Sequence, residues 1–132
     1  MSSVRDTYGA VFAGGSAVLM ARVTYVDGTL VVPDDIATVT YDITQHSGCS
    51  TEHGSMVSGH SGVSLASGTV LTETLQTDSA WTEDSTGYNF RHEIDVSNDP
   101  AFQEANRSYR VRYVLTPVAG QPIIVRFELE AI

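Results

Sequence analysis

The chain has 132 residues, enough to bury the core of one domain, and 42% of them are hydrophobic, which argues against a disordered tail. It combines 16 acidic residues with 7 basic ones for a formal net charge of −9. Such a surface repels phosphate backbones, so we expect no nucleic-acid partner. Cys49 is the single cysteine, which excludes an internal disulfide.

The chain shows no sign of a membrane segment. No apolar stretch approaches the roughly 20 residues that a membrane-spanning helix needs. The first residues also lack the apolar core of a secretory signal. We therefore expect a soluble protein made in the cytoplasm, without a membrane partner.

The first 15 residues are predicted to form an N-terminal arm or a short edge strand, followed by a single β-sandwich domain over residues 16–132. Two apolar side chains, Val11 and Phe12, lie among glycines that let the backbone approach another surface. We expect Val11 and Phe12 to contact a neighbouring subunit or a shell protein rather than their own domain. The alternative is an ordinary first strand of the same sandwich.

Several segments show the period of two that marks half-buried strands, or short apolar runs of strand length. In chain order these segments are 17–26, 29–32, 36–44, 63–65, 69–75 and 88–96. Asp27 and Gly28 predict a hairpin turn between the first two, because glycine tolerates positive φ. Pro33 ends the second, since proline has no amide hydrogen for the strand ladder.

The segments between these strands are richer in polar and small residues. Residues 45–62 contain many Gly, Ser and His residues and are predicted to form a long loop. Residues 76–87 are predicted to form a surface segment anchored by Trp81. Asp99 and Pro100 suit the N-cap and the first position of one or two helical turns over residues 99–105.

The clearest alternation lies near the C-terminus, in residues 109–115 and 123–129, which a short link joins as a hairpin. Their apolar sides, predicted to be buried, consist of Tyr109, Val111, Tyr113, Leu115, Ile123, Val125, Phe127 and Leu129. The whole pattern predicts an all-β fold, an immunoglobulin-like antiparallel β-sandwich of about seven strands. A barrel or a jelly roll is the alternative. Tyr109, which enters a strand after an irregular connection, is predicted to act as a tyrosine corner.

One group of residues has the chemistry of a metal site. The candidates are His46, Cys49, His53 and His60, whose imidazoles and thiolate are preferred zinc ligands. They are scattered through a flexible loop, whereas structural zinc sites hold paired ligands on defined turns. We therefore expect ordinary loop histidines, an unpaired thiol, and no metal or cofactor.

Other chemistry finds weaker support. His92 lies on the apolar side of its strand, which predicts a neutral, hydrogen-bonded histidine inside the sandwich, or else a pH-sensitive contact between subunits. Asp34 and Asp35 suit turn formation better than calcium binding. Trp81 and Tyr88 suit local packing better than a sugar-stacking platform. No Gly-x-Ser-x-Gly elbow occurs, and no pair of carboxylates is singled out, so we do not expect an enzyme.

All seven basic residues are arginines. Arg110, Arg112 and Arg126 fall on the polar sides of the two C-terminal strands. Arginine binds carboxylates in bidentate fashion, so these residues are candidates for contact with an acidic partner surface. The alternative is that they are solvated positions that pair with Glu128 and Glu130.

Three stretches resemble known proteins. Residues 17–29 and 35–43 resemble the opening of small immunoglobulin-like virion proteins of tailed bacteriophages, and they are similar in style to the N-terminal domain of phage baseplate upper proteins. Residues 75–92 resemble a segment of phage and prophage-like open reading frames. The resemblance brings no catalytic residue with it.

The resemblance implies a structural protein of a tailed-phage virion, made in the host cytoplasm. We expect a capsid decoration or cement protein, or else a head–tail or tail accessory protein. The implied partners are capsid or tail subunits, with the chain present as a homo-oligomer or in many copies on a shell. The alternative function is a glycan- or receptor-binding β-sandwich module on a virion or a cell surface.

Overall fold

The computed structural model describes residues 6–25, 27–46, 55–77, 81 and 85–132. Two short helical segments, η1 (Pro33–Asp35) and α1 (Ser67–Val70), lie between strands. The strands are β1 (Asp6–Val11), β2 (Val18–Ala21), β3 (Ile36–His46), β4 (Ser55–Met56), β5 (Val63–Leu65), β6 (Leu71–Gln76), β7 (Tyr88–Glu93), β8 (Ser108–Pro117) and β9 (Ile123–Ala131).

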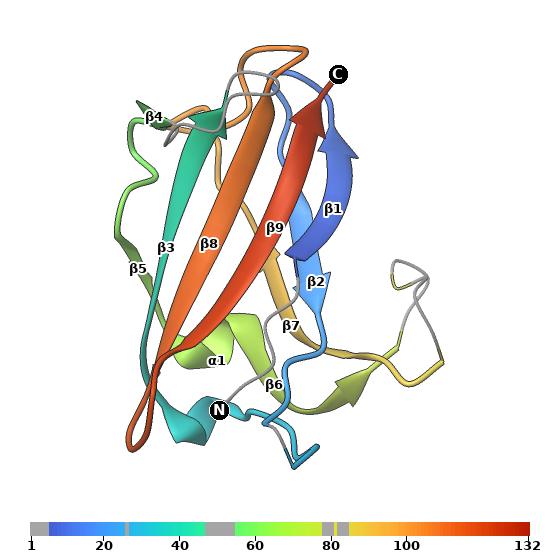
Figure 1. Cartoon of the computed structure of the whole chain (residues 1–132), viewed down its shortest axis with the longest axis vertical. Helices are drawn as coiled ribbons and strands as arrows, with labels where there is room; N and C mark the ends of the chain where they lie inside the picture. Colours follow the sequence, from blue (N-terminus) through green and yellow to red (C-terminus); the bar gives the residue numbers. More distant parts are fainter. Residues whose placement is uncertain (1–5, 26, 47–54, 78–80, 82–84) are drawn as a thin grey trace.

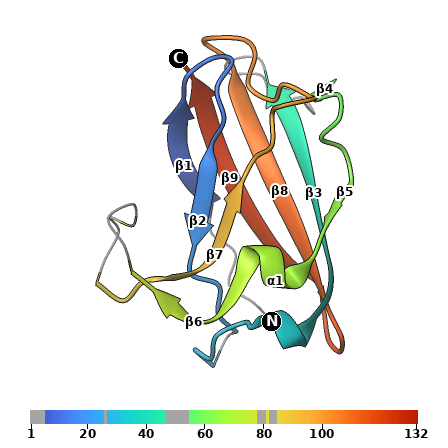
Figure 2. The same ribbon diagram turned by 180° about the vertical axis from the view of Figure 1, so that it is seen from behind.

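These strands form two sheets that pack face to face (Figures 1 and 2). The first has the order β1-β9-β8-β3-β4, with β5 also paired to β3, and the second has the order β2-β7-β6. All pairings are antiparallel except that of β1 with β9, which is parallel. The order β9-β8-β3 opposite β2-β7-β6 is that of strands G-F-C and B-E-D of an immunoglobulin sandwich. The predicted fold class is therefore confirmed.

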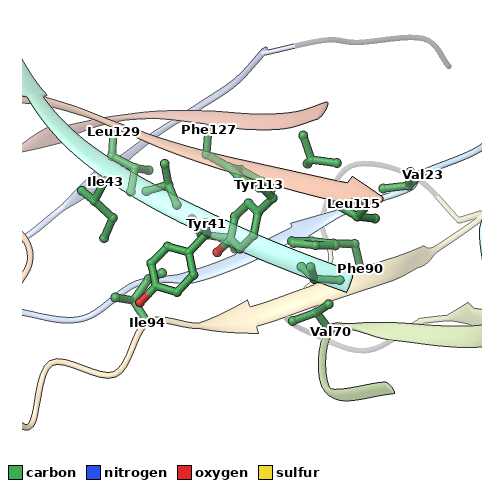
Figure 3. Close-up of a cluster of buried hydrophobic side chains, with 14 of the residues drawn as sticks. Val23, Tyr41, Ile43, Val70, Phe90, Ile94, Tyr113, Leu115, Phe127 and Leu129 are labelled. Carbon is green, nitrogen blue, oxygen red and sulfur yellow. The ribbon is translucent and has the colours of Figure 1, made fainter. Parts of the chain in front are cut away.

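The core lies where the two C-terminal strands face the second sheet. All eight apolar positions predicted on 109–115 and 123–129 are buried. Tyr113 from β8 meets Phe90 from β7 edge to face, with ring centroids 4.8 Å apart, and Phe127 lies 5.9 Å from the same ring. The three rings converge between the sheets (Figure 3). Such ring pairs stabilise a core beyond the burial of their area.

Tyr109 forms the predicted tyrosine corner. Its hydroxyl accepts a hydrogen bond from the backbone N–H of Glu104 at 3.0 Å, and its ring packs edge-on against Phe102. The predicted helix over 99–105 is wrong, because these backbone groups bond elsewhere. The carbonyl of Phe102 accepts a hydrogen bond from the backbone N–H of Gly14. The Phe102 side chain is fully buried in the core.

The first predicted strand, 17–26, ends already at Ala21. Beyond it, the backbone of Val23 hydrogen-bonds to a buried side chain instead of to a neighbouring strand. Asn89 of β7 is fully buried, and its amide donates to the carbonyls of Val23 and Val31 while accepting from Val23 N–H. The predicted turn at Asp27 and Gly28 does form, with Gly28 at φ +89°. It closes an isolated bridge between Thr24 and Leu30 rather than a full hairpin.

Residues 6–11 form an edge strand. β1 pairs with β9 of its own chain over six residues, from Asp6 opposite Arg126 to Val11 opposite Ala131. The expectation that residues 1–15 pack on a neighbour rather than on their own domain is therefore wrong for residues 6–11. It is also wrong for Ala13 and Gly14, whose amides donate to the carbonyls of Ile132 and Phe102. Residues 1–5 lie outside the described residues.

The remaining segments follow the predictions in part. β3 continues two residues past the predicted end to His46, and the expected loop 45–62 contains β4, while residues 47–54 lie outside the described residues. β5 forms as predicted over 63–65. The predicted strand 69–75 begins instead as α1 and becomes β6 at Leu71. The strand predicted over 88–96 ends at Glu93.

The burial pattern of β9 predicts a large difference between its two faces. Phe127→Ala should lower the free energy of unfolding by about 3–5 kcal/mol, because it empties a site at the centre of the core. Glu130→Ala, at an exposed position of the same strand, should change it by less than about 0.5 kcal/mol. Urea unfolding measures both values, and a larger effect at Glu130 would mean that the register of β9 is misassigned.

Candidate functional site

The most unusual polar feature is a group of four buried side chains at the centre of the sandwich, the Tyr–His cluster, made of Tyr41, His60, His92 and Tyr113. Tyr41 and Tyr113 come from adjacent strands, β3 and β8, and are directly paired in register. His92 comes from β7 of the second sheet, and His60 comes from the turn before β5. Two of the four residues therefore reach the cluster from outside the first sheet.

Each histidine of the cluster bonds to one tyrosine. His92 Nδ1 lies 2.6 Å from the Tyr113 hydroxyl, and His60 Nδ1 lies 2.8 Å from the Tyr41 hydroxyl. His60 Nε2 is 2.6 Å from the carbonyl oxygen of Asp99. A carbonyl can only accept, so Nε2 carries the proton, and in the neutral ring Nδ1 accepts from Tyr41.

Burial sets the protonation of the other pair. Burial, and next the proximity of His60, lower the pKa of His92 from 6.5 to about 4. Burial likewise raises the pKa of Tyr113. At neutral pH both groups are uncharged, so the His92–Tyr113 contact is a neutral hydrogen bond between the two sheets. The prediction of a neutral, hydrogen-bonded His92 inside the sandwich is confirmed.

The hydrogen bonds of the Tyr–His cluster join separate parts of the fold. Both nitrogens of His60 are engaged, and each tyrosine hydroxyl already has a histidine partner. His60 ties its turn to β3 and to the β7–β8 connection. The turn before β5 lies so close to Asp99 that it needs glycine at position 59, where φ is +83°. A Cβ there would lie 2.2 Å from the Asp99 carboxyl carbon.

The metal candidates do not come together within the described chain. His60 is 2% exposed, so the expectation of a loop histidine is wrong at this position. His46 Nε2 lies 3.2 Å from the Thr44 hydroxyl at the end of β3. Cys49 and His53 lie outside the described residues. Among the residues that the structure describes, no group of three potential metal ligands occurs.

The candidate interaction arginines lie on the outward side of the first sheet. Arg110 and Glu128, paired in register across β8 and β9, form an ion pair, as one of the alternative interpretations predicted. Arg112 is exposed and lies opposite Arg126 on one side and opposite Asp42 on the other. The strand register thus brings all three predicted arginines onto one face.

The other predicted contact residues lie at the end of β1. Val11 is the last residue of that strand, and its side chain is outside the described set. Phe12 follows it and is 75% exposed. The amide of Ala13 donates to the carbonyl of Ile132, itself 55% exposed, so the C-terminus lies against this turn. Phe12 and Ile132 therefore belong to the same end of the sandwich, referred to below as the apolar end.

A groove of about 270 Å³ lies between the end of β3, β4 and the connection before β8. Its lining includes Met56, which is 54% exposed, and Glu104. The Glu104 carboxylate is already engaged by Gln45 Nε2 at 2.7 Å and by Arg107 at 3.3 Å. This groove was not predicted, because its residues come from three distant segments.

The two remaining predictions concern Trp81 and the paired aspartates. The Trp81 ring lies 5.6 Å from that of Tyr88, which is buried, so Tyr88 does not offer an open face to a sugar. Asp35 accepts from Val32 N–H at 3.3 Å at the start of η1, and Asp34 lies in the same turn. Asp34 and Asp35 thus shape a turn, as predicted.

Comparison with protein-family models, curated proteins and solved structures found no match for this chain. Within the described residues, no helix is long and apolar enough to cross a membrane.

The buried His92 predicts sensitivity to acid. Its pKa in the folded state, about 4, lies below the ordinary 6.5, so folding releases a proton between these values. The stability it contributes is complete above pH 6.5 and is lost as the pH falls to 4, a loss of about 3 kcal/mol.

The free energy of unfolding in urea, measured at pH 7 and pH 4, tests this. His92→Gln should be less stable at pH 7, yet its fall between the two pH values should be smaller than that of the wild type. His46→Gln, at a half-buried residue outside the cluster, should keep the full fall. An unchanged pH dependence in His92→Gln would contradict the assignment.

Proposed function

We propose that this chain is a structural protein of a tailed-phage virion that binds the capsid shell as a decoration protein, in many copies. The resemblance of residues 17–29, 35–43 and 75–92 supports the virion assignment. The proposed location is the virion, with synthesis in the host cytoplasm. The surface feature that supports binding to another protein is the apolar end of the sandwich.

An exposed phenylalanine is the single observation that most favours an interface at this end. Phe12 is the most exposed large apolar side chain among the described residues, and Ile132, which follows the end of β9, accepts a hydrogen bond from the neighbouring Ala13. Aromatic side chains are enriched where protein surfaces bind partners, whereas a charged, acidic chain gains nothing by exposing one to water. β4, which contains Met56 of the groove described above, lies at the same end of the sandwich as the C-terminus (Figure 1).

The edge of the first sheet supports the same kind of contact. β1 is the terminal strand of its sheet and pairs only with β9 among the described strands. A terminal strand has backbone N–H and C=O groups that can add a strand from another protein. Strand pairing together with an apolar anchor at the strand's end suits attachment to a repeated site on a shell.

The composition of the virion tests the proposal. Particles of a tailed phage whose genome encodes the chain should contain it after density-gradient purification. Quantitative mass spectrometry should give a copy number comparable to that of the major capsid protein. A few copies per particle would instead favour a head–tail or tail accessory role. Expression of the chain in infected cells without incorporation into particles would contradict the virion proposal.

Two exposed apolar residues at opposite ends of the molecule give a matched pair of variants. Phe12 follows β1, and Val118, 72% exposed, lies in the β8–β9 hairpin at the other end (Figure 1). Phe12→Ser should leave the melting temperature unchanged but reduce binding to particles that lack the chain. Val118→Ser should change neither property. Equal binding by Phe12→Ser and the wild type in a co-sedimentation assay would exclude the apolar end as the interface.

A further inference from the structure

The outward face of the first sheet contains a second surface feature, distinct from the apolar end. Arg112 lies on β8, which has β9 on one side and β3 on the other, so it is near the middle of the face rather than at an edge. Its side chain is exposed. Arginine, with Trp and Tyr, is enriched among the residues that dominate binding energy near the centres of protein interfaces.

The charges around Arg112 leave it available to a ligand. Arg110, two residues earlier on the same face, is paired with Glu128. The acidic residue opposite Arg112 on β3 is Asp42, whose Oδ1 accepts a hydrogen bond from Gly62 N–H at 2.6 Å. Among the described residues, Arg112 has no ion pair. The face thus combines one neutralised arginine with one that is open to solvent.

The residue opposite Arg112 on β9 is another arginine. The register places Arg112 directly across from Arg126. Like charges directly opposite each other on a sheet are destabilising. A carboxylate bound at Arg112 therefore offsets the positive charge that this arginine places next to Arg126.

An apolar step lies beside the arginines. Val114 and Ile124 are paired in register two residues further along the same strands, on the same face, and both are half-buried. Side chains at i and i+2 on a strand share a face. An extended segment lying along β8 would therefore place one side chain at a positive site and the side chain two residues later at an apolar site. The residue between them would point away from the sheet.

We propose that the arginine face, made of Asp42, Arg110, Arg112, Val114, Ile124 and Arg126, binds an extended acidic segment of another protein. The segment has a carboxylate for Arg112 and an apolar side chain two residues away for Val114 and Ile124. This inference rests on the proposed function for the identity of that protein as a virion component. It adds the chemistry of the partner.

A carboxylate-bearing protein fits this face better than a nucleic acid does. The chain has a net charge of −9, and the two arginines are flanked by the acidic residues Asp42 and Glu128. A phosphate backbone would need a continuous basic track, which these flanking carboxylates interrupt. An isolated carboxylate needs only the bidentate contact that one guanidinium provides.

A peptide probe tests the face without knowledge of the partner. The probe is a capped peptide of repeating Glu-Ser-Leu-Ser, in which Glu and Leu share one side when the peptide is extended. At about 1 mM and low salt it should shift the NMR signals of the Arg112 side chain and of the β8 and β9 amides. A matched peptide with Lys in place of Glu should not. Equal shifts with both peptides, or no shifts on this face, would overturn the proposal.

A charge reversal with a matched control gives the second readout. Arg112→Glu should weaken binding of the peptide at least about tenfold, whereas Arg91→Glu should not. Arg91 is exposed on β7 of the other sheet, so its variant makes the same change in net charge. Arg112→Glu should keep a melting temperature close to the wild type, because relief at Arg126 offsets the new repulsion at Asp42. If Arg112→Glu impairs folding, Arg112→Gln replaces it as the test variant, because it removes the charge without reversing it. Arg112→Gln should also weaken binding of the peptide.

Assays on particles separate this inference from the proposed function. If the wild-type chain binds particles and Arg112→Glu does not, both the virion assignment and the arginine face are supported. Wild-type chain and Arg112→Glu that bind equally well contradict the arginine face alone. If the peptide binds in a way that depends on Arg112 but the chain is absent from virions, the virion assignment is contradicted. The arginine face is then still supported as a binding site. A short DNA duplex that binds this face more tightly than the acidic peptide would overturn the choice of partner.

Discussion

The contact between Tyr113 and His92 is the interaction on which the rest of the sandwich depends. Tyr113 comes from the middle of the first sheet and His92 from the second, and their hydrogen bond of 2.6 Å is buried between aromatic rings. A buried polar group without a partner is costly, so each residue fixes the position of the other. This bond joins β7 of the second sheet to β8 of the first. His60 then uses the neighbouring Tyr41 to hold the turn before β5 and the connection before β8.

The arrangement has a consequence for function. The four side chains of the Tyr–His cluster form hydrogen bonds within the core of the fold. Surface features are left for recognition: the apolar end around Phe12, and the arginine face around Arg112. The two lie on different parts of the molecule, since Phe12 follows the edge strand β1 and Arg112 lies in the central strand β8. Two separate contact surfaces on one small domain would fit the decoration role proposed above.

Much of the fold could be predicted from local patterns. The period of two in residues 109–115 and 123–129 predicted strands, buried faces and outward arginines, because burial on one side of a strand determines alternation. The tyrosine corner followed from the position of Tyr109. The burial of His60 could not be predicted, because its partners Tyr41 and Asp99 are distant in sequence and only the fold brings them together. The helix predicted over 99–105 failed for the same reason. Its backbone groups bond to residues such as Gly14, which no local pattern reveals.

The central claim is that the Tyr113–His92 bond couples the two sheets. A double-mutant cycle in urea unfolding at pH 7 measures it most directly, with Tyr113→Phe, His92→Leu and the double variant. Tyr113→Phe keeps the ring and removes only the hydroxyl, so it should cost about 1–3 kcal/mol in the wild-type background. In the His92→Leu background it should cost much less, which gives a coupling energy above about 0.5 kcal/mol. Additive effects, with no coupling between the two residues, would contradict this account of how the sandwich is held together.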